Sequence, residues 1–333
     1  MTLIQGDVIK SLQTLPSESI DCIMTSPPYW ALRDYGMEGQ IGFEPTFEEY
    51  LEHMLQITSE LKKVLKKTGT FWLNIGDTYS GSNCGSNDYR EIDGLGSRPQ
   101  ERYKNQKAGR TSLPDKCLMM IPERLVIDMI DQGWILRNKI IWHKPNHMPS
   151  SVKDRLSNGW EYLYLFVKNK RYFFDLDSIR EPHKTLQKPV KNGTTKISAE
   201  QAESLGSPRA RYHREKNHQP EFRNNNFGTN VQNETINPLG KNPGDVWEIP
   251  THPFPDSHFA VFPPKLCERP IKAGCPDNGT VLDPFAGSGT VGKVAIEMRR
   301  NAVLIELNLE YCDMIKKRLN WGSPFLEWEF KVV

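Results

Sequence analysis

The sequence predicts an α/β fold built on a doubly wound, largely parallel sheet. Two patterns indicate this fold. Short apolar runs of strand length alternate with amphipathic helical segments, and a glycine-rich turn joins a strand to a helix near the carboxyl terminus. A chain of 333 residues can form one large domain with an insertion, or two modest domains.

The first half of the chain supplies most of the expected strands. Apolar runs predict strands at 3–4, 20–24, 70–75, 135–142 and 160–167, with a further short strand at 172–175. Helical periodicity covers 8–15, 47–67 and 118–131. Gly69 is expected to end the second of these helices. Pro27 and Pro28 follow the run at 20–24, so that strand must end there.

The second half contains a polar insertion and then a regular alternation. Residues 181–245 are rich in Asn, Lys and Arg with little periodicity, and 80–112 is a similar long loop that we expect to be mobile. Order resumes at 259–267. It continues with strands at 280–282 and 302–305 and helices at 290–299 and 309–319. The expected divisions are therefore 1–180, 181–245 and 246–333.

Composition narrows the class of protein. Hydrophobic residues make up 37% and charged residues 25%, and the sequence shows neither a signal peptide nor a membrane-spanning run, so we expect a cytoplasmic protein. The six cysteines form no Cys-x-x-Cys pair, which predicts neither a disulfide framework nor a metal site. The net charge of +2 does not by itself indicate a nucleic-acid partner.

The decapeptide from Asp283 to Gly292 lies between a predicted strand and a predicted helix. Gly287, Gly289 and Gly292 satisfy the pattern Gly-x-Gly-x-x-Gly, in which the backbone turns tightly and approaches a ligand closely. Glu306 closes the next strand, where a carboxylate can accept hydrogen bonds from both hydroxyls of a ribose. The pattern favours an adenosine-containing ligand, with nicotinamide dinucleotide as one candidate. The structural alternative is a tight turn that only packs the helix on the sheet.

The tetrad Ser26-Pro27-Pro28-Tyr29 follows the strand at 20–24. The exocyclic amine of a base is a poor nucleophile, because its lone pair is delocalised into the ring, and acceptors for its two hydrogens promote pyramidalisation. Ser26 offers a hydroxyl oxygen, and Pro28 fixes the direction of the preceding carbonyl group. Tyr29 offers a flat face for an extruded base, and orientation then favours in-line attack on an activated methyl group. The alternative is a proline-rich turn whose aromatic rings cover the core.

These features together resemble the β-class amino-DNA methyltransferases, in the branch with Thr-Ser-Pro-Pro-Tyr-Trp. The resemblance covers nearly the whole chain except 181–240. The matching blocks are 6–7, 25–30, 73–77, 137–138, 142–146, 148–155, 172–175, 258–266, 283–290 and 305–308. The resemblance implies a Rossmann-like methyltransferase sheet that is circularly permuted, with the catalytic motif before the cofactor motif. It argues against nicotinamide, because a dehydrogenase has no use for the tetrad.

The resemblance also implies S-adenosyl-L-methionine as the cofactor. The glycine loop and the segment before Leu266 would hold its methionine end, Glu306 its ribose and Asp7 its adenine amino group. The expected cofactor residues are Asp7, Phe262, Pro263, Lys265, Leu266, Asp283, Pro284, Phe285, Ala286, Gly287, Ser288, Gly289, Thr290, Glu306, Leu307 and Asn308. The expected catalytic residues are Ser26, Pro27, Pro28 and Tyr29.

Four of these residues, Asp7, Ser26, Asp283 and Glu306, each lie just past the carboxyl end of a predicted strand. Ligands bind at this edge of an open parallel sheet, in the crevice where the strand order reverses. We therefore expect the four motifs to meet in one active site.

In the family a leading serine accompanies cytosine N4, and a leading aspartate accompanies adenine N6. The expected reaction is thus methylation of cytosine N4 in a base flipped out of duplex DNA, with adenine N6 as the alternative. Residues 181–245 would be the target recognition region between the catalytic half, 1–180, and the cofactor half, 246–333. The expected contacts to the base pocket or DNA are Trp30, Asp77, His143, Lys144 and Arg155.

Some alternatives stay open at this point. Asp77 could equally cap a turn. Arg90, Arg98, Arg102 and Arg110 of the 80–112 loop are expected on phosphates. The expected partners are double-stranded DNA and a cognate restriction endonuclease that acts on the same site without forming a complex; solitary and phage-encoded roles are alternatives. A rival of another class is a DNA-binding protein without catalysis that keeps the cofactor as a structural ligand.

Overall fold

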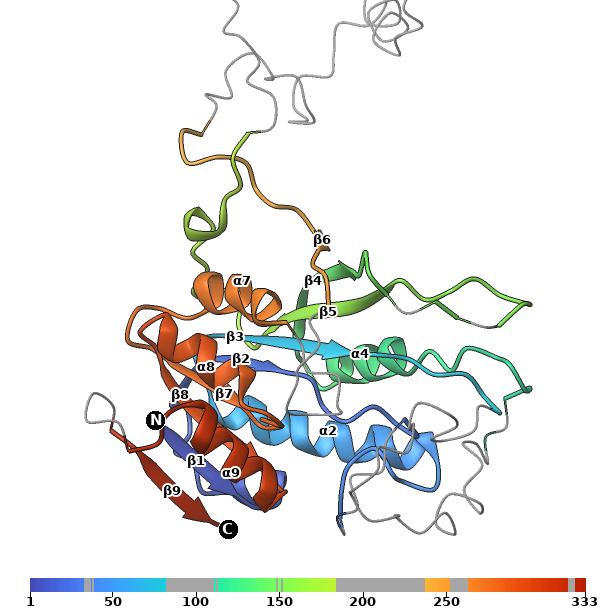
Figure 1. Cartoon of the computed structure of the whole chain (residues 1–333), viewed down its shortest axis with the longest axis horizontal. Coiled ribbons are helices and arrows are strands. Elements are labelled where there is room, and N and C mark those ends of the chain that lie inside the picture. The colour runs from blue at the N-terminus through green and yellow to red at the C-terminus, as the bar shows by residue number, and fades with distance from the viewer. Residues whose placement is uncertain are drawn as a thin grey trace, which may run out of the picture. The chain divides into compact units, whose positions relative to one another are not determined.

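The described part of the chain is an alternating α/β structure (Figure 1). The computed structural model describes residues 1–32, 37, 39–81, 111, 113–147, 149–150, 152–183, 237–251, 263–322 and 327–333. The elements, in chain order, are β1 (Thr2–Gln5), α1 (Val8–Gln13), β2 (Ile20–Thr25), α2 (Phe47–Val64), β3 (Leu65–Ile75), α4 (Ile121–Asp131), β4 (Ile135–His143), β5 (Trp160–Val167), η1 (Asp177–Ile179), β6 (Val246–Glu248), α7 (Pro264–Gly274), β7 (Thr280–Asp283), α8 (Thr290–Glu297), β8 (Asn301–Glu306), α9 (Leu309–Arg318) and β9 (Glu329–Val332).

The strands form one sheet, which confirms the α/β class. Within the described residues nine strands lie in the order β6-β4-β5-β3-β2-β7-β8-β1-β9. Neighbouring strands are parallel, except that β5 runs antiparallel to both β3 and β4. All of β2 is buried, as a central strand covered on both faces should be.

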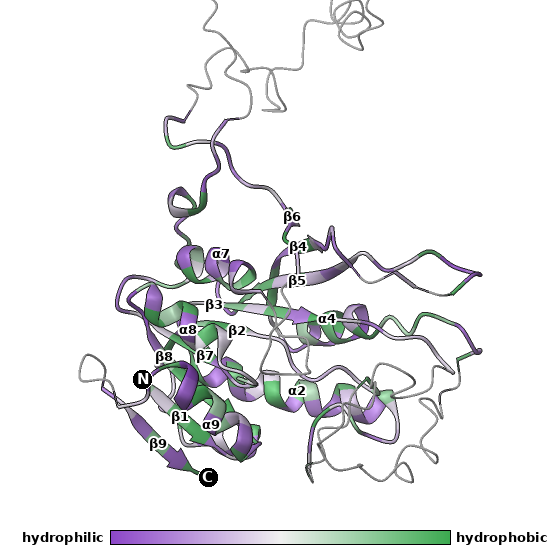
Figure 2. Ribbon diagram, in the orientation of Figure 1, coloured by the Kyte–Doolittle hydropathy of each residue, from purple (hydrophilic) through white to green (hydrophobic). Residues whose placement is uncertain are grey.

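Helices cover both faces of this sheet. Because successive side chains of a strand point to opposite sides, each face packs its own set of side chains against its own helices. On one face Ile23 and Phe71 pack in a core with α1, α2 and α4. On the other face Cys22 and Trp72 pack with α7 and α8, and Leu304 packs with α9. Most of these helices carry a hydrophobic and a hydrophilic stripe in Figure 2, as amphipathic helices do.

Two local expectations were wrong. Helix α2 ends at Val64 rather than near Gly69, because the extended, buried Leu65 already pairs with Ile20 of β2. Gly69 instead lies in an irregular stretch of β3, where a Cβ would come within 2.5 Å of the Leu65 side chain. The segment 172–175 is not a strand. Its backbone donates to Thr68 O and Ala273 O, which ties it to β3 and α7 rather than to a strand neighbour.

The chain divides into two compact units. The first comprises Met1–Ile179 and Pro243–Val333 and contains the sheet; the second is Arg180–Asn242. Within the second unit the backbones of Glu181 and Lys241 pair in both directions, at 3.0 and 2.8 Å. Residues 184–236 lie outside the described residues, so the recognition region expected at 181–245 stays a prediction. Among the described helices, none has the length and apolar character needed to cross a membrane.

Candidate active site

The sheet brings the sequence motifs to one edge. Strands β2, β7, β8 and β1 are consecutive neighbours and are parallel to one another. Ser26 follows β2, Asp283 and Glu306 end β7 and β8, and Asp7 stands two residues beyond β1. The four residues expected at carboxyl ends of strands therefore lie along a single edge of adjacent strands. This edge is where a parallel sheet binds its ligands.

The glycine loop is held by Glu306. Gly287 N donates to Glu306 Oε2 at 2.7 Å, and Asn308 N donates to Glu306 Oε1 at 2.9 Å. Gly289, with φ of +77°, begins α8 in the left-handed conformation that glycine adopts without strain. A Cβ added to Gly287 would meet no atom within 4 Å, so open space lies beside the loop there. The loop is thus fixed at its base and open at its tip.

Arg318 of α9 braces the same loop, and sequence reasoning missed it. Its Nη1 donates to Ser288 O at 2.9 Å, to Ser288 Oγ at 2.8 Å and to Thr290 Oγ1 at 3.0 Å. Its place in the last turn of an amphipathic helix resembles that of an ordinary basic helix end, so the sequence carries no signal for this contact. Ser288 and Thr290 are buried.

Thr25 joins the tetrad to the cofactor loop. Its Oγ1 donates to Asp283 Oδ1 at 2.7 Å, and Phe285 N donates to the same oxygen at 3.1 Å. Burial raises the pKa of Asp283 to about 7, against the opposing effect of these hydrogen bonds. Burial also raises the pKa of Glu306 to about 7. Two desolvated carboxylates on neighbouring strands form a site that a cationic ligand would stabilise.

The tetrad forms a tight, packed turn. The hydroxyl of Tyr50 on α2 donates to Pro28 O at 3.0 Å and so attaches the turn to that helix. Ser26 Oγ lies 3.4 Å from Tyr29 Oη. The ring of Tyr29 packs on Gly76, where a Cβ would lie 2.4 Å from Tyr29 Cε2. Ser26 and Tyr29 are both half-buried, so they are neither in the core nor freely solvated.

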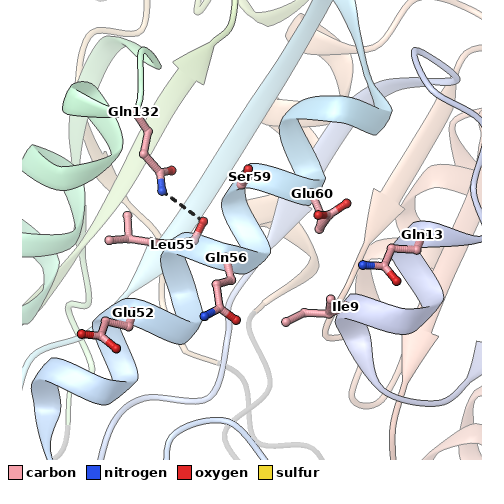
Figure 3. Close-up of a pocket in the computed structure, with 8 residues that line it drawn as sticks. All are labelled: Ile9, Gln13, Glu52, Leu55, Gln56, Ser59, Glu60 and Gln132. Carbon is pink, nitrogen blue, oxygen red and sulfur yellow. Dashed lines mark hydrogen bonds between the residues drawn. The ribbon is translucent and has the colours of Figure 1, made fainter.

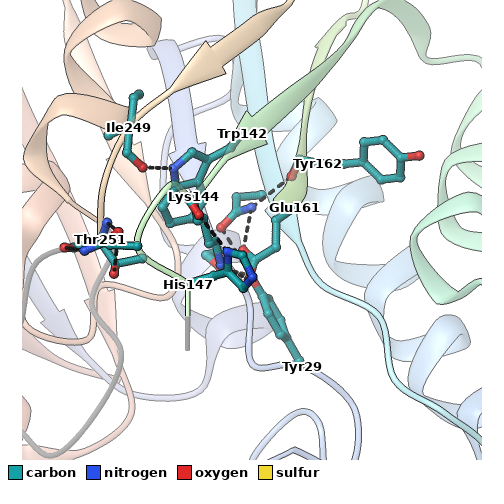
Figure 4. Close-up of polar contacts among 11 residues, drawn as sticks. Tyr29, Trp142, Lys144, His147, Glu161, Tyr162, Ile249 and Thr251 are labelled. Atoms are coloured by element: carbon teal, nitrogen blue, oxygen red, sulfur yellow. Dashed lines mark hydrogen bonds and ion pairs between the residues drawn. The ribbon is translucent and has the colours of Figure 1, made fainter. Parts of the chain in front are cut away.

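Tyr29 is anchored by a polar cluster, of which only Lys144 was expected near the site from the sequence. Tyr29 Oη donates toward Glu161 Oε2 at 3.0 Å and Asn74 Oδ1 at 3.2 Å, and Glu161 Oε1 pairs with Lys144 (Figure 4). Burial raises the pKa of Tyr29 well above its usual value, so the phenol stays a donor. One sequence feature could have indicated Glu161, because it is a carboxylate at the start of the otherwise apolar strand β5. In the sheet Glu161 pairs with Trp142 of β4, and Lys144 follows Trp142 by two residues.

Trp30 and Asp77, which were expected at the base pocket or on DNA, both contact other parts of the protein. Trp30 lies in the core against Phe47 and donates to Glu44 O, so its ring is not open to a base. Asp77 accepts from Met120 N and Ile121 N and thereby caps the start of α4, which is a helix cap rather than the turn cap that was the alternative; its place at the base pocket stays a prediction.

Arg155 is exposed and His143 is half-buried. His143 Nδ1 lies 3.5 Å from Glu248 Oε2 on β6. The guanidinium of Arg155 lies 4.1 Å from the centre of the Tyr79 ring. The structure assigns neither residue to the Tyr29 cluster.

The segment before α7 is only partly described. Phe262 lies outside the described residues, as do Arg90, Arg98, Arg102 and Arg110. Pro263 precedes α7, Leu266 is fully buried, and Lys265 is exposed in the first helical turn. Asp7 caps α1 by accepting from Lys10 N at 3.0 Å. A separate pocket between α1 and α2 contains none of the motif residues (Figure 3).

Comparison with known proteins decides the family. The model of the N6_N4_Mtase family, a DNA methylase family, matches residues 20–317. The chain belongs to the N6/N4 DNA methylase family. Type II methyltransferase M.XycI of Xanthomonas campestris pv. cyanopsidis is 38% identical over 318 residues, which cover 96% of this chain and 87% of that protein. This methyltransferase therefore acts on DNA, and the nicotinamide alternative is set aside.

Solved structures share the fold. The PvuII DNA methyltransferase, named cytosine-N4-specific, has a TM-score of 0.59 at 18% identity and covers 98% of this chain and 87% of its own. A candidate DNA modification methylase of Thermus thermophilus, complexed with S-adenosyl-L-methionine, has a TM-score of 0.54 at 21% identity. The match covers 99% of this chain and 98% of that chain. S-adenosyl-L-methionine is the cofactor of this family of methyltransferases, including this chain.

The residues at the sheet edge fit this cofactor. It carries a sulfonium, an ammonium and two ribose hydroxyls, which are partners for carboxylates. Asp283 is buried and Glu306 is half-buried, and no Lys or Arg among the described residues forms an ion pair with either. The open space at Gly287 lies beside Glu306, to which its amide donates. The expected cofactor residues therefore offer acceptors and room, although their individual roles stay predictions.

Proposed function

We propose that this methyltransferase methylates the exocyclic N4 of cytosine in a base flipped out of duplex DNA. The observation that carries the proposal is the hydrogen bond between Thr25 and Asp283. It couples the residue that precedes Ser26 to the strand end that opens the glycine loop. A target amine at Ser26 would therefore lie beside a cofactor at Asp283.

The residues of the tetrad suit amine chemistry. S-adenosyl-L-methionine supplies an electrophilic methyl group when bound. Ser26 offers an acceptor for one N–H of the amine, and Tyr29, anchored by Glu161, offers a ring on which a flipped base can stack. Transfer would form the bond between N4 and the methyl carbon as the sulfur–methyl bond breaks, S-adenosyl-L-homocysteine would leave, and the amine would release one proton to water. Because positioning supplies most of this rate enhancement, the chain needs no covalent nucleophile.

The choice of cytosine rests on Ser26. In the family a leading serine accompanies cytosine N4, and the PvuII enzyme, which shares the fold, is named cytosine-N4-specific. Either acceptor could serve either amine physically, so adenine N6 is the second candidate and the family model covers both reactions. The Type II name of M.XycI favours a role beside a restriction endonuclease that cuts the same site. Residues 181–245 are the candidate for reading that site.

The product identifies the base. Purified protein is incubated with S-adenosyl-L-methionine and unmethylated genomic DNA, which is then digested to nucleosides and analysed by mass spectrometry. We expect N4-methylcytosine. N6-methyladenine would support the proposed mechanism and change the target base to adenine. Cofactor binding without any modified nucleoside would favour the role of a DNA-binding protein without catalysis.

A further inference from the structure

A carboxylate lies behind the tetrad on a strand that the proposed reaction does not otherwise use. Glu161 is the second residue of β5. Because β5 is antiparallel to β3, its first residues reach the edge at which β2 and β3 end. Glu161 Oε2 accepts from Tyr29 Oη at 3.0 Å and from Asn74 Nδ2 at 3.3 Å, and its Oε1 pairs with Lys144 (Figure 4).

The chemistry of the members fixes the direction of these hydrogen bonds. An ionised carboxylate only accepts, so Tyr29 gives its single hydroxyl hydrogen away from Ser26, toward Glu161. Asn74 enforces the same direction. Its Nδ2 donates to Tyr162 O at 2.9 Å, which leaves Asn74 Oδ1 as an acceptor 3.2 Å from the same hydroxyl. Tyr29 Oη can therefore meet Ser26 Oγ, 3.4 Å away, only as an acceptor.

This direction decides what Ser26 presents to the target. Once Ser26 gives its hydrogen to Tyr29, its remaining lone pairs can accept an N–H of the amine. With the opposite direction, the Ser26 hydrogen would face the amine hydrogens and oppose binding. We infer that Glu161 is a positioning residue that makes Ser26 a hydrogen-bond acceptor by acting through Tyr29. The inference rests on the proposed amine methylation.

Lys144 supplies the positive charge that balances Glu161. The side chains of Lys144 and Glu161 are only 17% and 22% exposed, and a carboxylate withdrawn from water needs such a counter-charge. The ammonium of Lys144 also lies 4.3 Å from the centre of the Trp142 ring, which holds it in place. Among the described groups, the charged partner of Glu161 thus comes from the end of the neighbouring strand β4.

The test is a single-turnover methyl-transfer assay with S-adenosyl-L-methionine and unmethylated genomic DNA. Glu161→Gln keeps the shape of the side chain but can donate to Tyr29, and we expect its rate to fall by about 10- to 100-fold, as for a lost hydrogen bond to a charged group. Its affinities for cofactor and DNA should stay those of the wild type, and its melting temperature, although lowered by the uncompensated charge of Lys144, should stay above the assay temperature. The matched control is Glu123→Gln, which breaks the 2.9 Å pair with Lys139 of β4 outside this cluster and should keep the wild-type rate.

A second background separates positioning from general damage. In Tyr29→Phe the link to Glu161 is absent, so adding Glu161→Gln should slow transfer no further. An unchanged rate in Glu161→Gln would overturn the inference. So would a rate loss that is equally large in both backgrounds, or one that follows a loss of folding or DNA binding. No methyl transfer by the wild type would overturn the proposed function as well, whereas an active wild type with an unaffected Glu161→Gln would overturn this inference alone.

Discussion

Thr25 Oγ1 and Asp283 Oδ1 are joined by a hydrogen bond of 2.7 Å between residues 258 positions apart in the sequence. The bond links β2, which leads into the tetrad, to β7, which leads into the glycine loop. This polar contact lies at the end of the paired strands β2 and β7 and ties the two halves of the proposed site together. Its removal should be measurable in both the stability of the protein and the titration of Asp283.

Thr25→Val removes this bond with little change in shape. We expect a loss of about 1.5–3 kcal/mol of unfolding free energy at pH 8, the worth of a hydrogen bond to a charged group. The pKa of Asp283 should also rise, by roughly one unit per 1.4 kcal/mol of lost stabilisation of the carboxylate. Chemical denaturation at pH 5 and pH 8 checks this, with a larger loss at pH 8. An equal loss at both values would contradict the role of the charge.

Cofactor affinity should rise with pH across neutrality. Burial raises the pKa of Asp283 and of Glu306 to about 7, so both are largely protonated at pH 5.5 and ionised at pH 8. A cationic cofactor favours the ionised forms, and each proton released adds up to about tenfold in affinity per pH unit. Calorimetric titration between pH 5.5 and 7.5 should show this rise. A flat profile would mean that neither carboxylate is coupled to the cofactor.

The same shifts predict the stability of the cofactor-free protein. A carboxyl whose folded pKa is raised stabilises the fold fully below its unfolded pKa, near 4, and this contribution disappears as pH rises through about 7. S-adenosyl-L-methionine should therefore raise the melting temperature more at pH 7.5 than at pH 6. Asp283→Asn is the control, because it removes one of the two titrating groups and should weaken this pH dependence.

Gly76→Ala should damage the chemistry and spare the cofactor. The new Cβ would lie 2.4 Å from Tyr29 Cε2, so the ring must move. A displacement of about 1 Å in a catalytic group can cost on the order of 100-fold in rate. We expect slow methyl transfer with unchanged affinity for S-adenosyl-L-methionine. In a Tyr29→Ala background, where no ring is displaced, the same substitution should add nothing; a further loss there would show a different cause.

Arg318→Met should weaken the cofactor site from behind. The substitution removes the donor that reaches Ser288 and Thr290. We expect affinity for S-adenosyl-L-methionine to fall by about tenfold, the worth of roughly one such hydrogen bond. Lys317→Met, an exposed neighbour on α9, is the matched control and should bind the cofactor normally. Equal cofactor affinities in the two variants would show that the glycine loop keeps its conformation without Arg318.

The sequence predicted those parts of the site that depend on local motifs. The strand before Ser26 and the strand that leads to the glycine loop begin where expected and end one residue later, because apolar runs and glycine or proline turns are local signals. The common edge of Asp7, Ser26, Asp283 and Glu306 followed from the geometry of a parallel sheet. Circular permutation and the recognition region stay predictions.

The contacts that the sequence did not reveal are long-range. Glu161 reaches the site because β5 is antiparallel to its neighbours, whereas the prediction considered only carboxyl ends of parallel strands. Arg318 acts from the end of a helix that has no motif. Trp30 was expected at the base pocket or on DNA, but its ring packs against Phe47 in the core. Such placements depend on tertiary packing, which no local pattern encodes.

The most direct test of the central claim compares wild type with Ser26→Ala in two assays on the same preparations. The first measures affinity for S-adenosyl-L-methionine, and the second measures N4-methylcytosine in treated DNA by mass spectrometry. The account predicts that the variant binds the cofactor as the wild type does and forms no detectable N4-methylcytosine. A Ser26→Ala protein that still forms N4-methylcytosine at the wild-type rate would contradict it.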